Sequence, residues 1–172
     1  MERSQSTIST SQSCEGVGLH TGVETVITFH PAPEDFGIRF VRSDIPNCLE
    51  VKADIDHVVD ISRGTTIEEN DIRIHTVEHA LAAVSGLRLD NILIELSGKE
   101  PPVMDGSAKD FVESLIKAGI KIQSKKRRVL EITRAVNYTN SYRDIDIHVI
   151  PSDRFRITFM VEYPLTCSRY SI

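Results

Sequence analysis

Two neighbouring segments, Thr76-Val-Glu-His-Ala-Leu-Ala-Ala-Val-Ser-Gly86 and Asp90-Asn-Ile-Leu-Ile-Glu-Leu96, decide the fold. In the first segment the apolar residues recur at the i, i+3, i+4, i+7 spacing of an amphipathic helix; they are Val77, Ala80, Leu81 and Val84. Gly86 is a suitable residue at which to end that helix. The second segment is a short apolar run closed by Ser97-Gly98, which predicts a strand.

The elements on either side of this pair complete an α+β pattern. Thr25–Phe29 and Gly37–Val41 have the β-branched and aromatic composition of strands. A second helix is predicted from Ser107, as its N-cap with Asp110 at the capping-box position, to Gly119. Its apolar face consists of Phe111, Val112, Leu115 and Ile116. These proportions predict a two-layer sandwich in which a pair of helices covers one face of a mixed sheet.

Charge divides the chain near residue 120. Residues 1–120 carry ten basic and twenty acidic side chains, whereas residues 121–172 carry ten basic and five acidic ones. Such a reversal of sign commonly marks a boundary between structural units. We therefore expect a polar tail over residues 1–7, a first domain over residues 8–122, a basic linker over residues 123–128 and a second unit over residues 129–172.

The second unit has only strand patterns, with alternation along Leu130–Tyr138, Ile145–Val149 and Phe155–Tyr163. They predict a three-strand meander with one apolar face and no helix to cover it. Such a sheet is an incomplete domain. We expect it to promote self-association of the chain, and the family resemblance carried by the motifs below implies that it holds the opening strands of a second domain similar to the first.

Composition excludes several classes of protein. No run of about 18 apolar residues occurs, so no membrane-spanning helix is predicted. Cys14, Cys48 and Cys167 fit neither a disulfide framework nor a metal clip, and a reducing, cytoplasmic compartment is expected. The basic run Lys125–Arg128 lacks the interleaved aromatics of a nucleic-acid module and is interpreted as a solvated linker.

The segment His75-Thr-Val-Glu-His79 carries the chemistry. On a helix His75 and His79 lie about 40° apart, with Glu78 beside them. Spacing alone leaves three readings open. Both histidines bind zinc, as in the inverted HxxEH peptidases; or one histidine binds zinc and Glu78 is a general base; or the segment is a solvated helix start with no metal.

Five motifs that follow one another along the chain help to choose among these three hypotheses. They are Glu15–Gly22, Gly64–Ile67, Thr76–His79, Gly86–Ile92 and Pro102–Ala108. In this order and spacing the chain resembles the zinc-dependent UDP-3-O-acyl-N-acetylglucosamine deacetylases of lipid A biosynthesis, from about Ile8 to Tyr163. The resemblance implies a UDP-linked acylated amino sugar as the substrate and hydrolysis of its N-acetyl group.

The resemblance also implies roles for particular residues. Glu78 is the general base, His79 is a zinc ligand, and His20, Thr65 and Thr66 bind the substrate. The family's other zinc ligands follow an HxxxD pattern, which does not occur after His79 in this sequence. We therefore expect the 172-residue chain alone to bind zinc weakly or not at all and to be inactive. A non-catalytic, self-associating fragment is the alternative.

Overall fold

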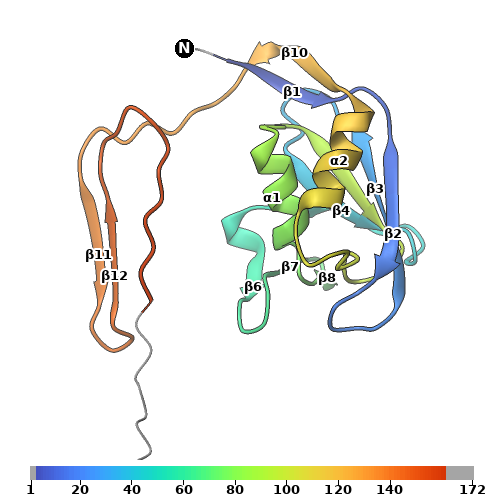
Figure 1. Ribbon diagram of the computed structural model, residues 1–172, viewed down its shortest axis with the longest axis horizontal. Coiled ribbons are helices and arrows are strands. Elements are labelled where there is room, and N and C mark those ends of the chain that lie inside the picture. Colours follow the sequence, from blue (N-terminus) through green and yellow to red (C-terminus); the bar gives the residue numbers. More distant parts are fainter. Residues whose placement is uncertain (1–2, 162–172) are drawn as a thin grey trace, which may run out of the picture. The chain divides into compact units, whose positions relative to one another are not determined.

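The computed structural model describes residues 3–161. The chain divides between Arg127 and Arg128 into two units. The first unit holds both helices and most of the strands, and the second holds a single hairpin (Figure 1). The α+β class is thus confirmed.

A five-stranded mixed sheet forms the centre of the first unit, in the order β2-β3-β9-β4-β5. Its strands are β2 (Gln12–Val17), β3 (Glu24–Pro31), β9 (Ile92–Leu96), β4 (Ile38–Arg42) and β5 (Val51–Lys52). The β4–β9 pair is parallel and the other three pairs are antiparallel. The strands expected at 25–29, 37–41 and 90–96 are therefore the three central strands of this sheet.

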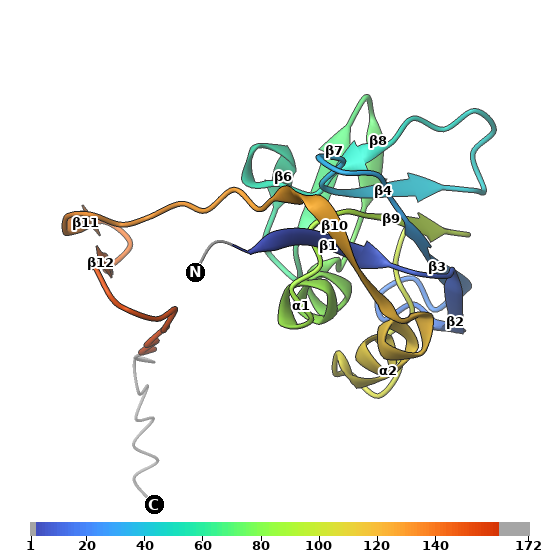
Figure 2. The ribbon, with the colours of Figure 1, turned by 90° about the horizontal axis from the view of Figure 1, so that it is seen from above.

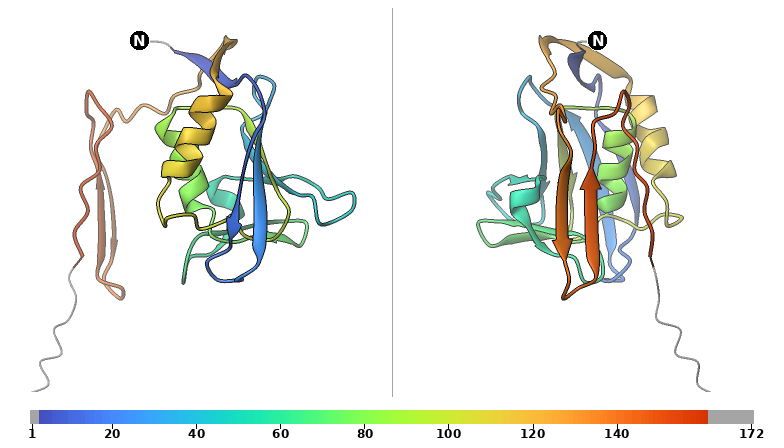
Figure 3. Two further views of the ribbon diagram at one scale, coloured as in Figure 1. Left: turned by 45° about the vertical axis from the view of Figure 1, so that its right-hand side comes forward. Right: turned by 90° about the vertical axis from the view of Figure 1, so that its left-hand side faces the viewer.

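Two helices, α1 (Glu78–Gly86) and α2 (Lys109–Ala118), lie together on one face of this sheet (Figures 2 and 3). They enclose the core, in which Phe29 of β3 and Phe111 of α2 meet edge to face with ring centroids 6.0 Å apart. The predicted apolar stripe of α1 faces inward, with Val77, Ala80 and Val84 buried. In α2, however, Ile116 is 58% exposed, because the apolar face is narrower than the sequence suggests.

The start of α2 differs from the predicted capping box. Ser107 is not the N-cap, because α2 begins at Lys109 and Ala108 occupies the cap position without a side-chain hydrogen bond. Ser107 lies one residue earlier, and its Oγ accepts a hydrogen bond from the Lys109 amide at 3.1 Å. The Ser107 amide itself donates to Asp105 Oδ1 at 2.9 Å. Asp110 is therefore not the partner of Ser107, and the Asp105 turn takes the place of the capping box.

A small three-stranded sheet lies beside the main one and consists of β6 (Val58–Asp60), β7 (Thr66–Glu69) and β8 (Ile72–Ile74). A short 3-10 helix, η1 (Ile55–His57), precedes β6. The turn between β6 and β7 and the chain after β8 carry the residues of the candidate site. Among the residues that the structure describes, no helix is long and apolar enough to cross a membrane.

The predicted N-terminal tail is wrong in part, since Ser4–Ile8 forms strand β1 and pairs antiparallel with β10 (Ile120–Lys126). The same pair overlaps the predicted linker, of which residues 123–126 belong to β10. Polar side chains conceal this strand in the sequence. Gln5, Ser6 and Thr7 are buried because distant residues satisfy their hydrogen bonds.

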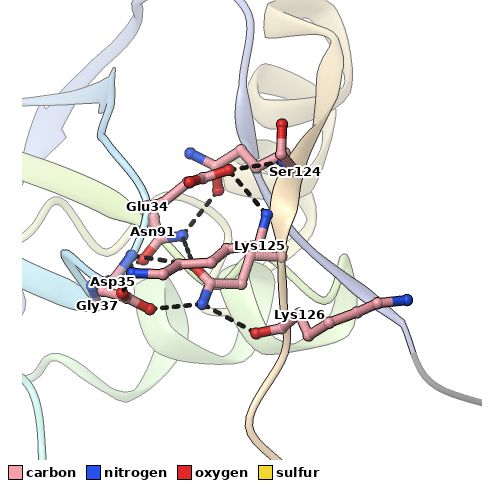
Figure 4. A network of polar contacts seen from close by, with 9 residues as sticks. Glu34, Asp35, Gly37, Asn91, Ser124, Lys125 and Lys126 are labelled. Carbon is pink, nitrogen blue, oxygen red and sulfur yellow. Dashed lines mark hydrogen bonds and ion pairs between the residues drawn. The ribbon is translucent and has the colours of Figure 1, made fainter.

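Figure 4 shows the polar network that secures this strand pair. The Asn91 side chain donates to Gln5 Oε1 at 2.8 Å and to Gln123 Oε1 at 2.7 Å, and it accepts from the Gly37 amide at 2.9 Å. Glu34 Oε1 accepts the Ser124 and Lys125 amides at 2.6 and 2.9 Å. The network ties β1 and β10 to the main sheet.

The second unit contains the hairpin of β11 (Val136–Asn140) and β12 (Ile145–Val149). No third strand follows within the described residues, because Phe155–Val161 pairs with no neighbouring strand there. Tyr163 lies outside the described residues. Alternation supplies strand propensity, but a strand forms only with a hydrogen-bonded partner, so the three-strand meander is wrong over the described part.

The aromatic contact in the core gives a first prediction. Phe111→Ala removes a fully buried ring and leaves a cavity against Phe29, which should lower the free energy of unfolding by about 3–5 kcal/mol. Urea denaturation followed by circular dichroism measures this change. The matched control is Ile116→Ala on the exposed side of α2, expected to cost less than about 1 kcal/mol. Equal losses in the two variants would contradict this packing.

Candidate functional site

A cavity of about 430 Å³ opens where the β2–β3 loop, the β6–β7 turn and the chain between β8 and α1 meet. Most of its lining residues are polar or charged, and both signs of charge are present. The lining residues are His20, Thr21, Val23, Asp60, Ser62, Arg63, Gly64, Thr66, His75, Thr76, Lys99 and Glu100. The structure therefore brings together two of the predicted site residues, His20 and Thr66.

The loop that carries His20 makes a tight turn, in which the Gly22 amide donates to the Gly18 carbonyl at 3.0 Å. A side chain at Gly18 would clash, since a Cβ there would lie 2.3 Å from Thr21 Oγ1 and 2.7 Å from Glu100 Oε2. His20 is exposed, and its Nε2 lies 3.2 Å from the Arg63 carbonyl oxygen. The glycine thus lets the loop close over a carboxylate and present His20 at the cavity.

Glu100 is that carboxylate, and its side chain is fully buried. It accepts hydrogen bonds from the amides of His20, at 3.1 and 3.2 Å, and of Thr21, at 2.9 Å. Thr76 Oγ1 also donates to it at 2.8 Å. Burial raises the pKa of Glu100, but the Thr76 and loop hydrogen bonds outweigh burial, so its pKa lies below the ordinary value.

His75 also lines the cavity. Its Nδ1 is 3.1 Å from Thr66 Oγ1, and its amide donates to the Lys99 carbonyl at 2.8 Å. Burial, followed by the positive charge of Lys99, lowers the pKa of His75. The neutral imidazole is therefore the favoured form, and it is already bonded to a neighbouring threonine.

Glu78 lies in the first turn of α1, where the helix dipole favours a negative charge. Its Oε2 accepts the Thr65 amide at 2.9 Å, and the Val77 amide donates to the Thr65 carbonyl at 3.2 Å. Gly64 passes so close that a Cβ there would lie 3.1 Å from Glu78 Oε1. The β6–β7 turn is thus hydrogen-bonded to the start of the helix and holds the Glu78 carboxylate in place.

His79 follows directly and is half-buried. Its imidazole makes no hydrogen bond or ion pair with the residues described here, so its nitrogens are available to a ligand. Imidazole suits zinc, but a catalytic zinc ordinarily has three protein ligands. No group of three His, Cys, Asp or Glu side chains placed to hold a metal occurs between residues 3 and 161.

Sequence reasoning found the carboxylate and the imidazoles but missed Arg63, Lys99 and Glu100. Arg63 and Lys99 look like ordinary surface cations in the sequence. Glu100 precedes Pro101-Pro102 and looks like part of a turn. No local pattern marks Glu100, because the isolated bridge between Gly18 and Pro102 that brings the two motifs together exists only in the folded chain.

A carboxylate held at the start of a helix, an adjacent imidazole with no partner among residues 3–161, and a cavity lined by the neighbouring Gly64 and Thr66 are features that hydrolytic sites commonly have. Comparison with known proteins makes this class specific. The family model described as LpxC, UDP-3-O-acyl N-acetylglycosamine deacetylase, matches residues 5–171. The chain belongs to this family.

Individual relatives agree with this assignment. The chain is 50% identical over 159 residues to a bifunctional enzyme LpxC/FabZ of Chlorobaculum tepidum, covering 92% of the chain and 34% of the relative. It is 38% identical to the UDP-3-O-acyl-N-acetylglucosamine deacetylase of Myxococcus xanthus, over 92% of the chain and 50% of that relative. It is 39% identical to the deacetylase of Nitratidesulfovibrio vulgaris, over 93% of the chain and 51% of that relative. The chain thus spans between a third and a half of these relatives.

The lowered pKa of Glu100 gives a prediction of pH dependence. A carboxyl whose pKa is lower folded than unfolded stabilises the fold above its unfolded pKa, about 4.3, and this stabilisation disappears as the pH falls through the folded pKa. Glu100→Gln should therefore lower the free energy of unfolding by about 1–3 kcal/mol at pH 7, and by less towards pH 3. Urea titrations across this range measure the difference.

Glu95→Gln is the control for this series. Glu95 pairs with His30 at 2.8 Å, and its side chain is 37% exposed, so its loss should cost no more than about 1 kcal/mol. A difference between wild type and Glu100→Gln that stays constant from pH 7 to pH 3 would contradict the ionised, hydrogen-bonded carboxylate.

Proposed function

We propose that this chain supplies the N-terminal part of a deacetylase that hydrolyses the N-acetyl group of UDP-3-O-(3-hydroxyacyl)-N-acetylglucosamine, in the biosynthesis of lipid A. Membership of the family supports the reaction. The observation that carries the proposal is the hydrogen bond from the Thr65 amide to Glu78, in the turn whose Gly64 and Thr66 line the cavity. The cytoplasmic compartment remains a prediction from the cysteine pattern.

Glu78 acts as the general base in this proposal. The Thr65 amide bonds to Oε2, which leaves Oε1 to take a proton from the water that attacks the acetamide carbonyl. A positioned base of this kind contributes about 10²–10⁴-fold to the rate.

His79 is the zinc ligand that this chain contributes, and the remaining ligands come from outside the described residues. When bound, such a metal polarises a carbonyl and acidifies water. The imidazole of His79 has no hydrogen-bond partner among residues 3–161, which supports this role. The chain alone is still predicted to bind zinc weakly or not at all and to be inactive, which an assay of the purified 172 residues tests.

His20, Thr65 and Thr66 bind the substrate in this proposal. His20 and Thr66 line the cavity, and Arg63 and Lys99 add positive charge to it. A diphosphate-linked sugar carries negative charge and many hydrogen-bonding groups, and cationic side chains suit such a ligand. The Thr65 side chain lies in the same turn, next to Gly64.

The two-histidine peptidase reading is less well supported. It needs His75 as a metal ligand, but His75 lies outside the Thr76–His79 motif that carries the resemblance. We therefore assign the metal-binding role to His79 alone.

A chimaera tests these roles with a complete enzyme. This chain replaces the 159 aligned residues of the Chlorobaculum tepidum relative, and deacetylation of the UDP-linked substrate is followed by release of acetate. Glu78→Gln should lower kcat at least 100-fold because the general base is lost. His79→Ala should lower both activity and bound zinc, measured by metal analysis of the purified protein.

Two control variants accompany this test. Glu113→Gln changes an exposed carboxylate on α2 and should leave kcat within about twofold of wild type. His75→Ala should retain most of the zinc. Loss of zinc from His75→Ala as complete as that from His79→Ala would favour the peptidase reading and contradict the assignment.

Self-association of the second unit is a separate proposal, carried by its exposed apolar side chains. Val136, Tyr138, Ile145, Ile147 and Val149 of the hairpin are each at least 38% exposed. Burying each such side chain is worth up to about 1.5–3 kcal/mol. An apolar strand pair of this kind commonly joins another copy.

Sedimentation velocity of the 172-residue chain tests this proposal. We expect a dimer or larger species at micromolar concentration, and dissociation to a monomer in Tyr138→Lys/Ile147→Lys, because charges on the face oppose its burial. Lys121→Glu on β10 is the control for added charge. A monodisperse monomer for the unmodified chain at all concentrations would contradict the proposal.

A further inference from the structure

Thr76 has an unusual backbone conformation for its residue type. Its φ is +55°, in the left-handed region, and it is β-branched. Side chains of this shape are rarely found there, and the conformation costs on the order of 1–3 kcal/mol. Such a conformation persists only where the surrounding structure enforces it. Thr76 also stands two residues before Glu78 and three before His79.

The buried Glu100 carboxylate is the group that enforces it. Thr76 is itself buried, and its hydroxyl donates to Glu100 Oε1 at 2.8 Å. On its other side the same carboxylate accepts the His20 and Thr21 amides. One side chain therefore binds both the start of α1 and the loop that carries His20.

We propose that Glu100 is a positioning residue, whose buried carboxylate holds the loop carrying His20 in register with the left-handed Thr76 that leads into Glu78 and His79. This inference rests on the proposed function, since it assumes that His20 and Glu78 act on the same substrate. Glu100 itself touches no reacting atom. It acts by keeping two separate segments at one fixed spacing.

The burial of Glu100 explains why a carboxylate is needed for this role. Three donors converge on it: two backbone amides and one hydroxyl. A carboxylate accepts up to about four hydrogen bonds and donates none. An alanine here would leave all three donors without that acceptor, at a cost of about 1–3 kcal/mol for each group that stays buried.

A matched pair at Thr76 tests the link to α1 in the chimaera. Thr76→Val keeps the β-branched shape and the backbone strain but removes the hydroxyl, whereas Thr76→Ser keeps the hydroxyl. We expect Thr76→Val to lower kcat/KM at least tenfold and Thr76→Ser to stay within about threefold of wild type. Equal activities for valine and serine would overturn the link.

The same logic applies to Glu100. Glu100→Ala should lower kcat/KM at least tenfold, with KM rising as His20 is released and kcat falling as Glu78 moves. Glu100→Gln keeps one acceptor oxygen and should recover at least a third of the lost activity on a logarithmic scale. A general loss of folding would give no such recovery, so the absence of rescue by glutamine would overturn the positioning role.

Amide hydrogen exchange on the 172-residue chain provides a readout that does not depend on deacetylation. In Glu100→Ala the His20 and Thr21 amides should exchange at least tenfold faster. The internal controls are the Ser124 and Lys125 amides, which donate to another carboxylate, Glu34, and they should not change. If the His20 and Thr21 rates are unaltered, the inference fails even where the chimaera is active. If the chimaera without any substitution is inactive, but the His20 and Thr21 amides of the Glu100→Ala chain exchange faster, the proposed function fails and the positioning role stands.

Discussion

Strand β9 must be paired along both edges and covered on one face, and most of the first unit follows from this constraint. It hydrogen-bonds to β3 on one side and to β4 on the other. Ile92, Ile94 and Leu96 are fully buried beneath the helices. A shift of one residue would turn this apolar set away from the core. The position of everything attached to the ends of β9 is therefore fixed as well.

A buried polar side chain lies just before β9, and another lies shortly after it. Asn91 comes directly before the strand and is 1% exposed, and Glu100 comes four residues after it and is fully buried. The amide of Asn91 both donates and accepts, so it joins strands with mixed requirements (Figure 4). The carboxylate of Glu100 only accepts, so it gathers donors. Buried polar groups of this kind favour one arrangement over its competitors when every partner is present.

The sequence predicts those helices and strands whose burial pattern depends only on residues near one another along the chain. The α1 stripe and the central strands are readable from periodicity, because each residue's environment follows from its neighbours along the chain. Strand β1 is not readable in this way, since Gln5 and Ser6 are buried by partners at residues 88–126. Glu78 and His79 could be singled out from spacing and resemblance. Glu100 could not, because its role depends on Gly18 and Thr76 meeting in space.

The pairing of β1 with β10 has a mechanical consequence. Ser4 lies opposite Lys126 and Ile8 opposite Ile120, so the chain enters and leaves the first unit at the same corner. A force between those two points would act along the hydrogen bonds of the pair, which run perpendicular to antiparallel strands. The bonds would then break one after another from that corner, as in a zipper, before the central sheet carried any load.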